Sequence, residues 1–322
     1  MWNPFKKNDS PVSLRDRLKE FSKLYKSNHR FNQIKVAAIV LGVGFGITHT
    51  LYMTHYFNMP VSHIALIQFE GPVQRGSKTG DGTILSEAIQ KAMNDPLAQV
   101  VYIEANSPGG SPVQAEILHR TIMNMRNTTH KPIIFSIGEM CASACLYVAS
   151  AADVVYAHAN SLIGSVGVRM DSWYLEDFIS KFDIERRTFT AGRNKAFLDP
   201  FQPMTKQAQS HLNNNILEPL YGEFKKALRE GRGEKLNEDN PDLYTGFIWT
   251  GSQAVEIGFA DELRTHFEVR EQIRETYQVK TIQNYTQPSF SFRKMLTAEF
   301  WADVVAQAAV KVQQQSNSIE LK

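Results

Sequence analysis

The sequence predicts an α/β domain with a largely parallel sheet and flanking helices. Short apolar runs such as Val100–Glu104 and Pro132–Ile137 are typical of buried parallel strands. Between such runs lie segments such as Ile84–Asn94, in which apolar residues recur at helical spacing. Alternation of the two kinds of segment indicates an α/β sheet. The Gly109-Gly110 turn and Ser143 each follow a predicted strand, at the sheet edge where such folds place their sites.

The individual elements follow from the same two patterns. Apolar runs predict strands at Ile64–Phe69, Val100–Glu104, Pro132–Ile137, Val154–Ala157, Ile163–Val168 and Ile184–Thr190. Helices are predicted at Ile84–Asn94, from the turn at Gly110 to about Met125, from Ser143 onward, at Trp173–Lys181 and at Thr205–Gly231. The first helix ends at Asp95-Pro96, because proline cannot continue a helix. Residues 74–82 and 232–245 are polar and predict loops.

The amino-terminal part differs from the rest of the chain in charge. Residues 1–35 carry nine lysines and arginines against three acidic residues, and no charged residue occurs from Val36 to Phe69. The core of that stretch, Val36–Met53, is about 18 residues long, just enough to span the hydrocarbon core of a bilayer. Because the basic side comes first, the positive-inside rule places the amino terminus in the cytoplasm. A buried core helix is the alternative; a cleaved signal peptide is not expected, since no small-x-small site follows Met53.

Composition and cysteine content limit the remaining possibilities. With 43% hydrophobic and 21% charged residues, the chain of 322 residues is ordinary for a globular protein. A net charge of +2 does not suggest nucleic-acid binding. The two cysteines, Cys141 and Cys145, bracket Ser143, and if both lay on one helix their geometry would suit a disulfide poorly. A cysteine nucleophile is a weak alternative, because no motif pairs either thiol with a histidine.

Three short motifs contain candidate catalytic residues. In two of them, small residues surround a hydroxyl or backbone N–H groups that could contact a substrate carbonyl. Ser143 lies between Ala142 and Ala144, whose small side chains let a carbonyl group approach the hydroxyl. The predicted helix start at Ser143 also favours developing negative charge. Gly109 and Gly110 form a turn whose backbone N–H groups can face a ligand without side-chain obstruction. The alternatives are a capping or packing serine and a simple strand-to-helix turn.

The third motif contains Lys195, followed by Phe197 and Leu198. A lysine that acts as a general base must be uncharged near neutral pH, and apolar surroundings favour that state. Phe197 and Leu198 are suited to supply such surroundings, whereas a solvated loop lysine is the alternative. Because no histidine belongs to any of the three motifs, the pattern favours a Ser-Lys dyad of Ser143 and Lys195.

These motifs, in this order, resemble the signal peptide peptidase A (SppA) family of membrane-bound serine peptidases, in the ClpP/crotonase fold group. The resemblance covers residues 62–265 and rests on Ser107–Gly110, Ala142–Ser143 with Tyr147–Asp153, Ile163–Val168, and Trp249–Gly251 with Gly258–Asp261. The separation of 52 residues between Ser143 and Lys195 also fits the family. The resemblance implies a ClpP/crotonase-like domain preceded by one transmembrane helix.

The resemblance implies a role for each reacting residue. Ser143 is expected to be the nucleophile and Lys195 the general base, while the hydroxyl of Ser165 orients the lysine. The oxyanion hole is expected at the N–H of Gly110, with Ala144 or Gly109 assisting.

The resemblance also implies how a substrate would bind. A peptide is expected to lie as an extended strand along Gly109–Pro112 and Ser165–Val168, in the manner of an added β-strand. The expected contacts are Ser111, Pro112, Val166 and Gly167. Neither a metal nor a nucleotide cofactor is implied.

We therefore predict a membrane-anchored, extracytoplasmic serine endopeptidase that hydrolyses residual signal peptides or other apolar, unfolded peptides. It is expected to cross the inner (cytoplasmic) membrane once, with the catalytic domain in the periplasm or outside the cell. The family also implies a ring-like homo-oligomer, in which serine and lysine can come from neighbouring subunits. The predicted parts are a basic cytoplasmic segment at 1–35, a transmembrane anchor at 36–57, a peptidase domain at 60–285, and an amphipathic helix with a polar tail at 286–322.

Departures from the family pattern keep a second function open. After the nucleophile position the family has two glycines, where this chain has Ala144 and Cys145, and the Arg193–Lys195 motif is atypical. The alternative is a catalytically silent, membrane-tethered scaffold of the same fold that binds peptides. A crotonase-type acyl-CoA enzyme shares the glycine turn but fits poorly with an external domain. The amphipathic segment Phe292–Val312 is open between packing on its own domain, docking on a neighbouring subunit and lying on the membrane.

Overall fold

The computed structural model describes residues 61–286 without a break and, before them, residues 15–20, 22–23, 26, 35, 38 and 41–49. The chain divides into two compact units, Met1–Pro60 and Val61–Lys322. In the first unit the described residues are helical, and nowhere in the described ranges is a helix both long and apolar enough to cross a membrane. Most of the predicted anchor at 36–57, and all but residue 286 of the predicted tail at 286–322, lie outside the described residues.

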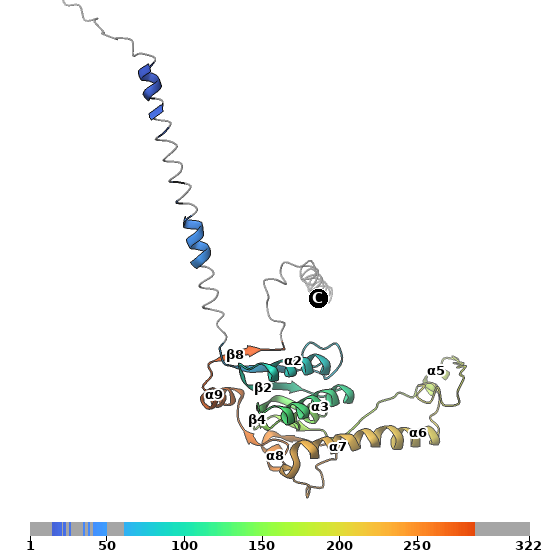
Figure 1. The fold of residues 1–322 in the computed structure, drawn as a ribbon. Coiled ribbons are helices and arrows are strands. Elements are labelled where there is room, and N and C mark those ends of the chain that lie inside the picture. Colours follow the sequence, from blue (N-terminus) through green and yellow to red (C-terminus); the bar gives the residue numbers. More distant parts are fainter. Residues whose placement is uncertain are drawn as a thin grey trace, which may run out of the picture. The chain divides into compact units, whose positions relative to one another are not determined.

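The strands within residues 61–286 form a single eight-stranded sheet (Figure 1). The strands are β1 His63–Glu70, β2 Ala98–Ser107, β3 Ile133–Ala142, β4 Val154–Ala157, β5 Leu162–Gly164, β6 Ile248–Thr250, β7 Glu262–Leu263 and β8 Thr281–Asn284. Their order is β6-β5-β3-β2-β1-β8, and β4 pairs with both β3 and β7. All neighbouring pairs are parallel except β5–β6, which confirms the predicted, largely parallel sheet.

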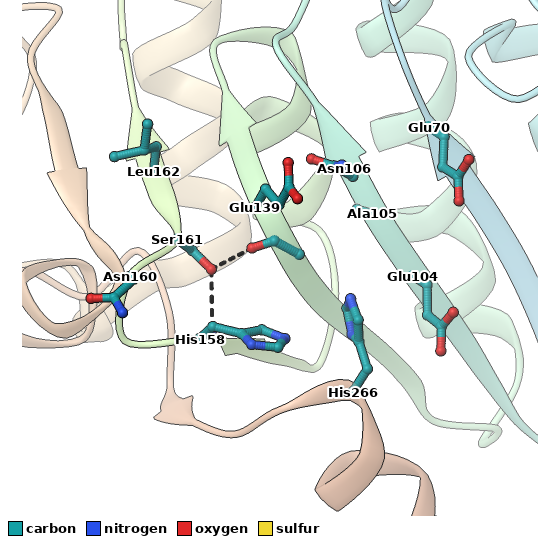
Figure 2. Close-up of a pocket in the computed structure, with 11 residues that line it drawn as sticks. Glu70, Glu104, Ala105, Asn106, Glu139, His158, Asn160, Ser161, Leu162 and His266 are labelled. Atoms are coloured by element: carbon teal, nitrogen blue, oxygen red, sulfur yellow. Dashed lines mark hydrogen bonds between the residues drawn. The ribbon is translucent and has the colours of Figure 1, made fainter.

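Strand β3 pairs with two different strands besides β2. Its residues Ile134–Ile137 pair with β4, and its last residues, Met140–Ala142, pair with β5. Figure 2 shows β3 and β5 side by side, with Glu139 on the first and Leu162 on the second. Because β5 holds the very end of β3, the chain leaves the sheet at a fixed place, directly before Ser143.

Helices cover both faces of this sheet. The α-helices within residues 61–286 are α2 Gly82–Asn94, α3 Pro112–Thr128, α4 Ala144–Ala149, α5 Glu176–Ser180, α6 Lys206–Leu212, α7 Glu218–Arg232, α8 Gly251–Glu256 and α9 His266–Tyr277, of which α5 does not pack on the sheet. Successive side chains of a strand point to opposite faces, so Ala65 and Ile67 of β1 belong to one apolar cluster and Ile64 and Leu66 to another. The first cluster packs with α2, α3, α4, α7 and α8, and the second packs with α9.

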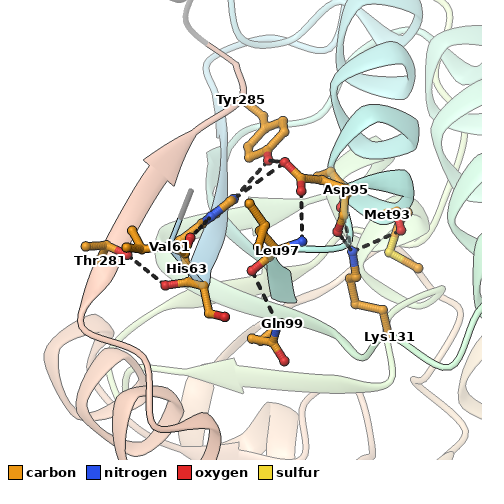
Figure 3. Close-up of polar contacts among 11 residues, drawn as sticks. Val61, His63, Met93, Asp95, Leu97, Gln99, Lys131, Thr281 and Tyr285 are labelled. Atoms are coloured by element: carbon orange, nitrogen blue, oxygen red, sulfur yellow. Dashed lines mark hydrogen bonds and ion pairs between the residues drawn. The ribbon is translucent and has the colours of Figure 1, made fainter. Parts of the chain in front are cut away.

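A polar cluster joins the edge of the sheet to the end of α2 (Figure 3). The Tyr285 hydroxyl, directly after β8, donates to Asp95 Oδ2 at 2.5 Å and lies 2.9 Å from Nε2 of His63 at the start of β1. The Tyr285 hydroxyl holds the pKa of Asp95 below its ordinary value. Lys131 Nζ donates to three carbonyl groups at the end of α2, at 2.6–3.0 Å, and so satisfies part of that helix terminus. The cluster fixes β8 as the edge strand beside β1.

The segment between β5 and α6 differs from the prediction. No strand forms at Ile184–Thr190, and the helix predicted at Trp173–Lys181 shortens to α5. No residue of α5 is buried, and Phe189 is 92% exposed. The apolar residues that suggested a strand therefore form an exposed surface rather than a buried face. We call residues 169–205 the arm; in Figure 1 its helix α5 lies apart from the sheet, near the outer end of α6.

Elsewhere the predicted elements form with shifted ends. The helix predicted at Thr205–Gly231 is confirmed as α6, a π-helical stretch at Asn213–Leu217 and α7, followed by a 3₁₀ turn at Gly233–Lys235. The strand predicted at Ile163–Val168 is shorter, because β5 ends at Gly164. For the elements from β6 to β8 the sequence patterns give no individual prediction.

A nearly buried ion pair joins α7 to the chain before β7. The Arg232 side chain, which is 1% exposed, donates to both carboxylate oxygens of Asp261, at 2.8 and 3.0 Å. Asp261 also accepts the Val155 N–H at 2.7 Å and contacts Lys235 Nζ at 2.7 Å. Burial alone would raise the pKa of Asp261, but Arg232 and Lys235, together with the Val155 N–H, hold it below its ordinary value.

Replacement of this carboxylate should destabilise the domain strongly. We expect Asp261→Ala to lower the free energy of unfolding by about 3–5 kcal/mol at pH 7, because the buried Arg232 would keep its hydrogen bond to the Gly258 carbonyl but lose its counter-ion. The folded-state pKa of Asp261 lies below the unfolded one, so its contribution is present above about pH 4 and is lost as the pH falls through the folded-state pKa. Denaturant titrations at pH 7 and at stepwise lower pH measure both effects.

The neighbouring Glu262 provides the matched control. It pairs with Arg264 at 2.7 Å, but the glutamate side chain is 51% exposed. Glu262→Ala should therefore change the free energy of unfolding by less than about 1 kcal/mol. Equal losses in the two variants would contradict the importance of the buried pair.

Candidate active site

Ser143 forms a sharp turn between the end of β3 and the start of α4. Its backbone has φ of 53° and ψ of −119°, a conformation that an L-residue adopts only when the surrounding structure imposes it. The Ser143 N–H donates to the Gly164 carbonyl at 2.8 Å, and its carbonyl accepts the Tyr147 N–H at 3.0 Å. The side chain makes no capping hydrogen bond to α4. The alternative that Ser143 caps the helix is therefore wrong.

The two cysteines lie on opposite sides of this turn and form a disulfide bond. Cys141 belongs to β3 and Cys145 to α4, so the expectation for two cysteines on one helix does not apply. Their Cα atoms are 5.0 Å apart, within the usual range for a disulfide. Because the bond uses both thiols, this form of the protein offers no cysteine nucleophile.

The predicted glycine turn packs directly against Ser143. A Cβ atom at Gly109, where φ is 98°, would lie 2.7 Å from the Ala142 carbonyl oxygen and 2.8 Å from Ser143 Cβ. A Cβ atom at Gly110 would lie 2.3 Å from the carbonyl oxygen of Val73. Close approach of backbone therefore requires glycine at both positions.

One cavity of about 650 Å³ collects most of the predicted site residues. Those that line it are Gly110, Pro112, Ser143, Ala144, Ser165 and Gly167. Gly109, Ser111 and Val166 do not line it. The Gly109 N–H donates to Ser107 Oγ at 3.2 Å, Ser111 is the N-cap of α3, and Val166 is 1% exposed. Gly110 and Ala144 are thus the predicted oxyanion-hole residues that share the cavity with Ser143.

Ser165 lies on the same cavity through a second strained turn. It follows β5 with φ of 56°, and its N–H donates to the Phe247 carbonyl at 2.7 Å. Gly164, directly before it, pairs with Ala142 at the end of β3. The turns that carry Ser143 and Ser165 are therefore held side by side by the pairing of β3 with β5.

An apolar wall completes the cavity and was not predicted from the sequence. It includes Ala115, Tyr147, Leu220 and Phe224, and the rings of Tyr147 and Phe224 lie 5.2 Å apart. Burial raises the pKa of Tyr147 to about 12, so its hydroxyl stays protonated at neutral pH. Tyr147 lies one helical turn after Ser143, a spacing that could have identified it. The residues from α7 give no comparable local signal.

Lys195 does not line this cavity. Its side chain is exposed in the arm, and its N–H donates to the Gly192 carbonyl at 3.0 Å. Its neighbours Asn194 and Phe197 line a different, smaller cavity together with residues of α6. Within one chain the structure therefore does not bring Lys195 to Ser143, nor does it give the lysine apolar surroundings.

A second cavity, of about 590 Å³, lies beside His158 and His266 (Figure 2). His266 Nδ1 is 2.6 Å from Ser136 Oγ, and burial lowers the pKa of His266. Ser136 is fully buried, so this Ser-His pair cannot meet a peptide. The Ser161 hydroxyl donates a hydrogen bond to the Gly138 carbonyl and accepts one from the backbone N–H of His158. In the described part of the chain no group of three or more histidine, cysteine or acidic residues is arranged to hold a metal ion.

Comparison with known proteins identifies the family. Residues 125–280 match the pattern of peptidase family S49. This part of the chain belongs to that peptidase family. The match confirms the resemblance to the SppA family that the motifs predicted, and it contains Ser143, Ser165 and Lys195.

Relatives of the S49 domain cover more of the chain. A protein named Protease 4 from Haemophilus influenzae is 29% identical over 212 residues, which are 65% of this chain and 34% of that protein. The chloroplastic serine protease SPPA of Arabidopsis thaliana is 25% identical over 205 residues, 62% of this chain and 30% of that protein. A protein named Na⁺/H⁺ antiporter NhaA from Brucella abortus is 33% identical over 236 residues, 72% of this chain. The chain spans about a third of the length of these relatives.

Proposed function

We propose that this S49 domain is a serine endopeptidase in which Ser143 attacks the carbonyl carbon of a peptide bond. The observation that supports it most is the convergence of Ser143, Gly110 and Ser165 on one cavity. Ser143 lines that cavity from a strained turn, and its hydroxyl makes no capping hydrogen bond to α4. Strained backbone of this kind is concentrated at functional sites in proteins.

In the proposed mechanism, main-chain groups stabilise the charge that develops during attack. The N–H groups of Gly110 and Ala144 would donate to the oxyanion of the tetrahedral intermediate. The Gly109 N–H is less suited to this role, since it already donates to Ser107 Oγ. Lys195 would accept the proton of the Ser143 hydroxyl and return it to the leaving amine, after which water hydrolyses the acyl-enzyme.

We propose that Lys195 reaches Ser143 of a neighbouring subunit in a ring-like homo-oligomer. The arm carries apolar side chains that are exposed in the single chain. They include Trp173, Phe178, Phe182, Ile184 and Phe189. The core also exposes apolar side chains at Leu162, Phe247 and Ile248, on β5 and beside it, which we call the rim. Association of arm and rim between copies would bury both surfaces and surround Lys195 with apolar groups, which favours an uncharged lysine.

The same proposal includes a membrane anchor and an apolar substrate. The uncharged stretch Val36–Met53, after a basic segment, supports a single-pass anchor with the domain on the outer side of the inner membrane. The wall of Tyr147, Leu220 and Phe224 supports substrates with apolar side chains, such as residual signal peptides or other unfolded apolar segments.

Covalent labelling tests this function directly. We expect a fluorophosphonate probe to label the full chain at Ser143, and Ser143→Ala and Lys195→Ala each to reduce peptide hydrolysis by about 10³-fold or more. Lys181→Ala, which removes another exposed lysine of the arm, is the matched control and should retain activity. A folded, oligomeric wild type that is neither labelled nor active would contradict the proposal and support the peptide-binding scaffold.

A further inference from the structure

The disulfide bond encloses the turn that carries Ser143. Cys141 and Cys145 are four residues apart, and Ser143 lies midway between them. Both cysteines are fully buried, so the bond belongs to the packed core under the site. A loop this short removes less entropy from the unfolded chain than a long one does. Its main effect is therefore expected on the geometry of the turn rather than on the stability of the whole domain.

The other contacts that hold the turn are the pairing of β3 with β5 and the backbone hydrogen bonds of Ser143. The backbone of Ser143 is fixed by one bond to the Gly164 carbonyl and one from the Tyr147 N–H. Its φ of 53° is unfavourable for a residue with a side chain, so the turn would relax toward a commoner conformation if its two ends could move. The disulfide joins those two ends, one in β3 and one in α4.

We propose that the Cys141–Cys145 disulfide is a positioning element that keeps the Ser143 hydroxyl aimed into the cavity. The inference rests on the proposed role of Ser143 as nucleophile. Reduction by a dithiol transfers two electrons and two protons to the bond, giving two cysteine thiols and the oxidised dithiol. The strand pairing of β3 and the packing of α4 remain, so the reduced domain stays folded while Ser143 loses its reactive orientation.

The composition of the chain makes this effect measurable without interference. The chain has two cysteines in all, so a reductant acts on this bond alone. We expect the rate of fluorophosphonate labelling of the full chain to fall about tenfold to a hundredfold on reduction. The thermal midpoint should shift by only a few degrees, and reoxidation should restore the labelling rate. Alkylation and mass measurement verify the number of free thiols.

A double variant is the matched control. Cys141→Ala/Cys145→Ala lacks the bond, should label as slowly as the reduced wild type and should not respond to the reductant. It also supplies the bond-free state if the buried sulfurs react slowly. A labelling rate within about twofold of the oxidised wild type in both bond-free forms would overturn the proposal. Parallel loss of labelling and of cooperative unfolding would also overturn it, because the bond would then serve the fold as a whole.

Hydrogen exchange separates this inference from the proposed function. If the oxidised wild type is not labelled at all, the peptidase function fails, but the positioning role can still be judged from the Ser143 amide. Faster exchange across residues 142–147 on reduction, with the remaining strands unchanged, would support positioning. Unchanged exchange there would overturn it.

Discussion

A mixture of the Ser143→Ala and Lys195→Ala variants is expected to hydrolyse peptides, although each variant alone is inactive. The reason is that Lys195 lies on the arm and does not line the cavity of its own Ser143. If each dyad takes its serine from one subunit and its lysine from the next, an equal mixture should contain intact dyads at about a quarter of its sites. Co-expression of the two variants with different tags, followed by purification on both tags, yields mixed rings in which hydrolysis of an apolar fluorogenic peptide is measured.

The control for this experiment pairs Ser143→Ala with the Ser143→Ala/Lys195→Ala double variant. Neither chain of that mixture carries Ser143, so the mixture should remain inactive. Mixed rings that form from the two single variants yet show no activity would contradict the shared dyad, because serine and lysine would then have to come from the same chain. The outcome therefore decides whether the arm of a neighbouring subunit or the chain's own arm supplies Lys195 to Ser143.

The second large effect is expected at Gly109. Gly109→Ala should reduce hydrolysis by about 10²–10³-fold, because the added methyl group would lie 2.7 Å from the Ala142 carbonyl oxygen and 2.8 Å from Ser143 Cβ. The two turns would have to separate, and Gly110 would move with respect to the nucleophile. Fluorophosphonate labelling rates and denaturant titrations, measured together, distinguish displacement of Ser143 from general unfolding.

Gly76 offers a control with the same backbone requirement. Its φ is 82°, against 98° at Gly109, but a Cβ atom there would have no neighbour within 4 Å. Gly76→Ala should therefore lower the free energy of unfolding by about 1 kcal/mol from backbone strain while leaving the labelling rate unchanged. If both variants lost activity equally, the strain itself, and not contact with Ser143, would account for the effect.

The sequence predicted the central part of the fold because that part is built from long, regular elements. Strands β1 to β4 are apolar runs buried on both faces, and α2 and α7 show clear helical spacing. The strands from β6 to β8 are only two to four residues long and mix polar with apolar residues, whereas β4, which is as short as β8, is apolar throughout. The strand predicted at Ile184–Thr190 is wrong for a different reason: its apolar residues lie on the exposed arm, where no strand is available to pair with them.

The site was predictable where it depends on local turns and not where it depends on long-range packing. Ser143, Gly110 and Ser165 follow strands, so the fold class alone predicts that they meet at one edge of the sheet. Leu220 and Phe224 reach the cavity from α7, and nothing in their local sequence indicates this. The disulfide could not be predicted, because the sequence did not show that the chain changes from strand to helix at Ser143. This change places Cys141 in β3 and Cys145 in α4, where the two can bond.

The dependence of Ser143 on main-chain partners has a consequence for how such a domain can diverge. Its turn is held by the carbonyl group of Gly164 and the N–H group of Tyr147, which every residue type except proline can provide. Side-chain identity matters where space is lacking, as at Gly109 and Gly164, and at the two cysteines whose disulfide joins the ends of the turn. Part of the apolar wall, Leu220 and Phe224, comes from the separate helix α7. Substitutions at Leu220 and Phe224 can therefore change the substrate preference, while the reacting groups keep their arrangement.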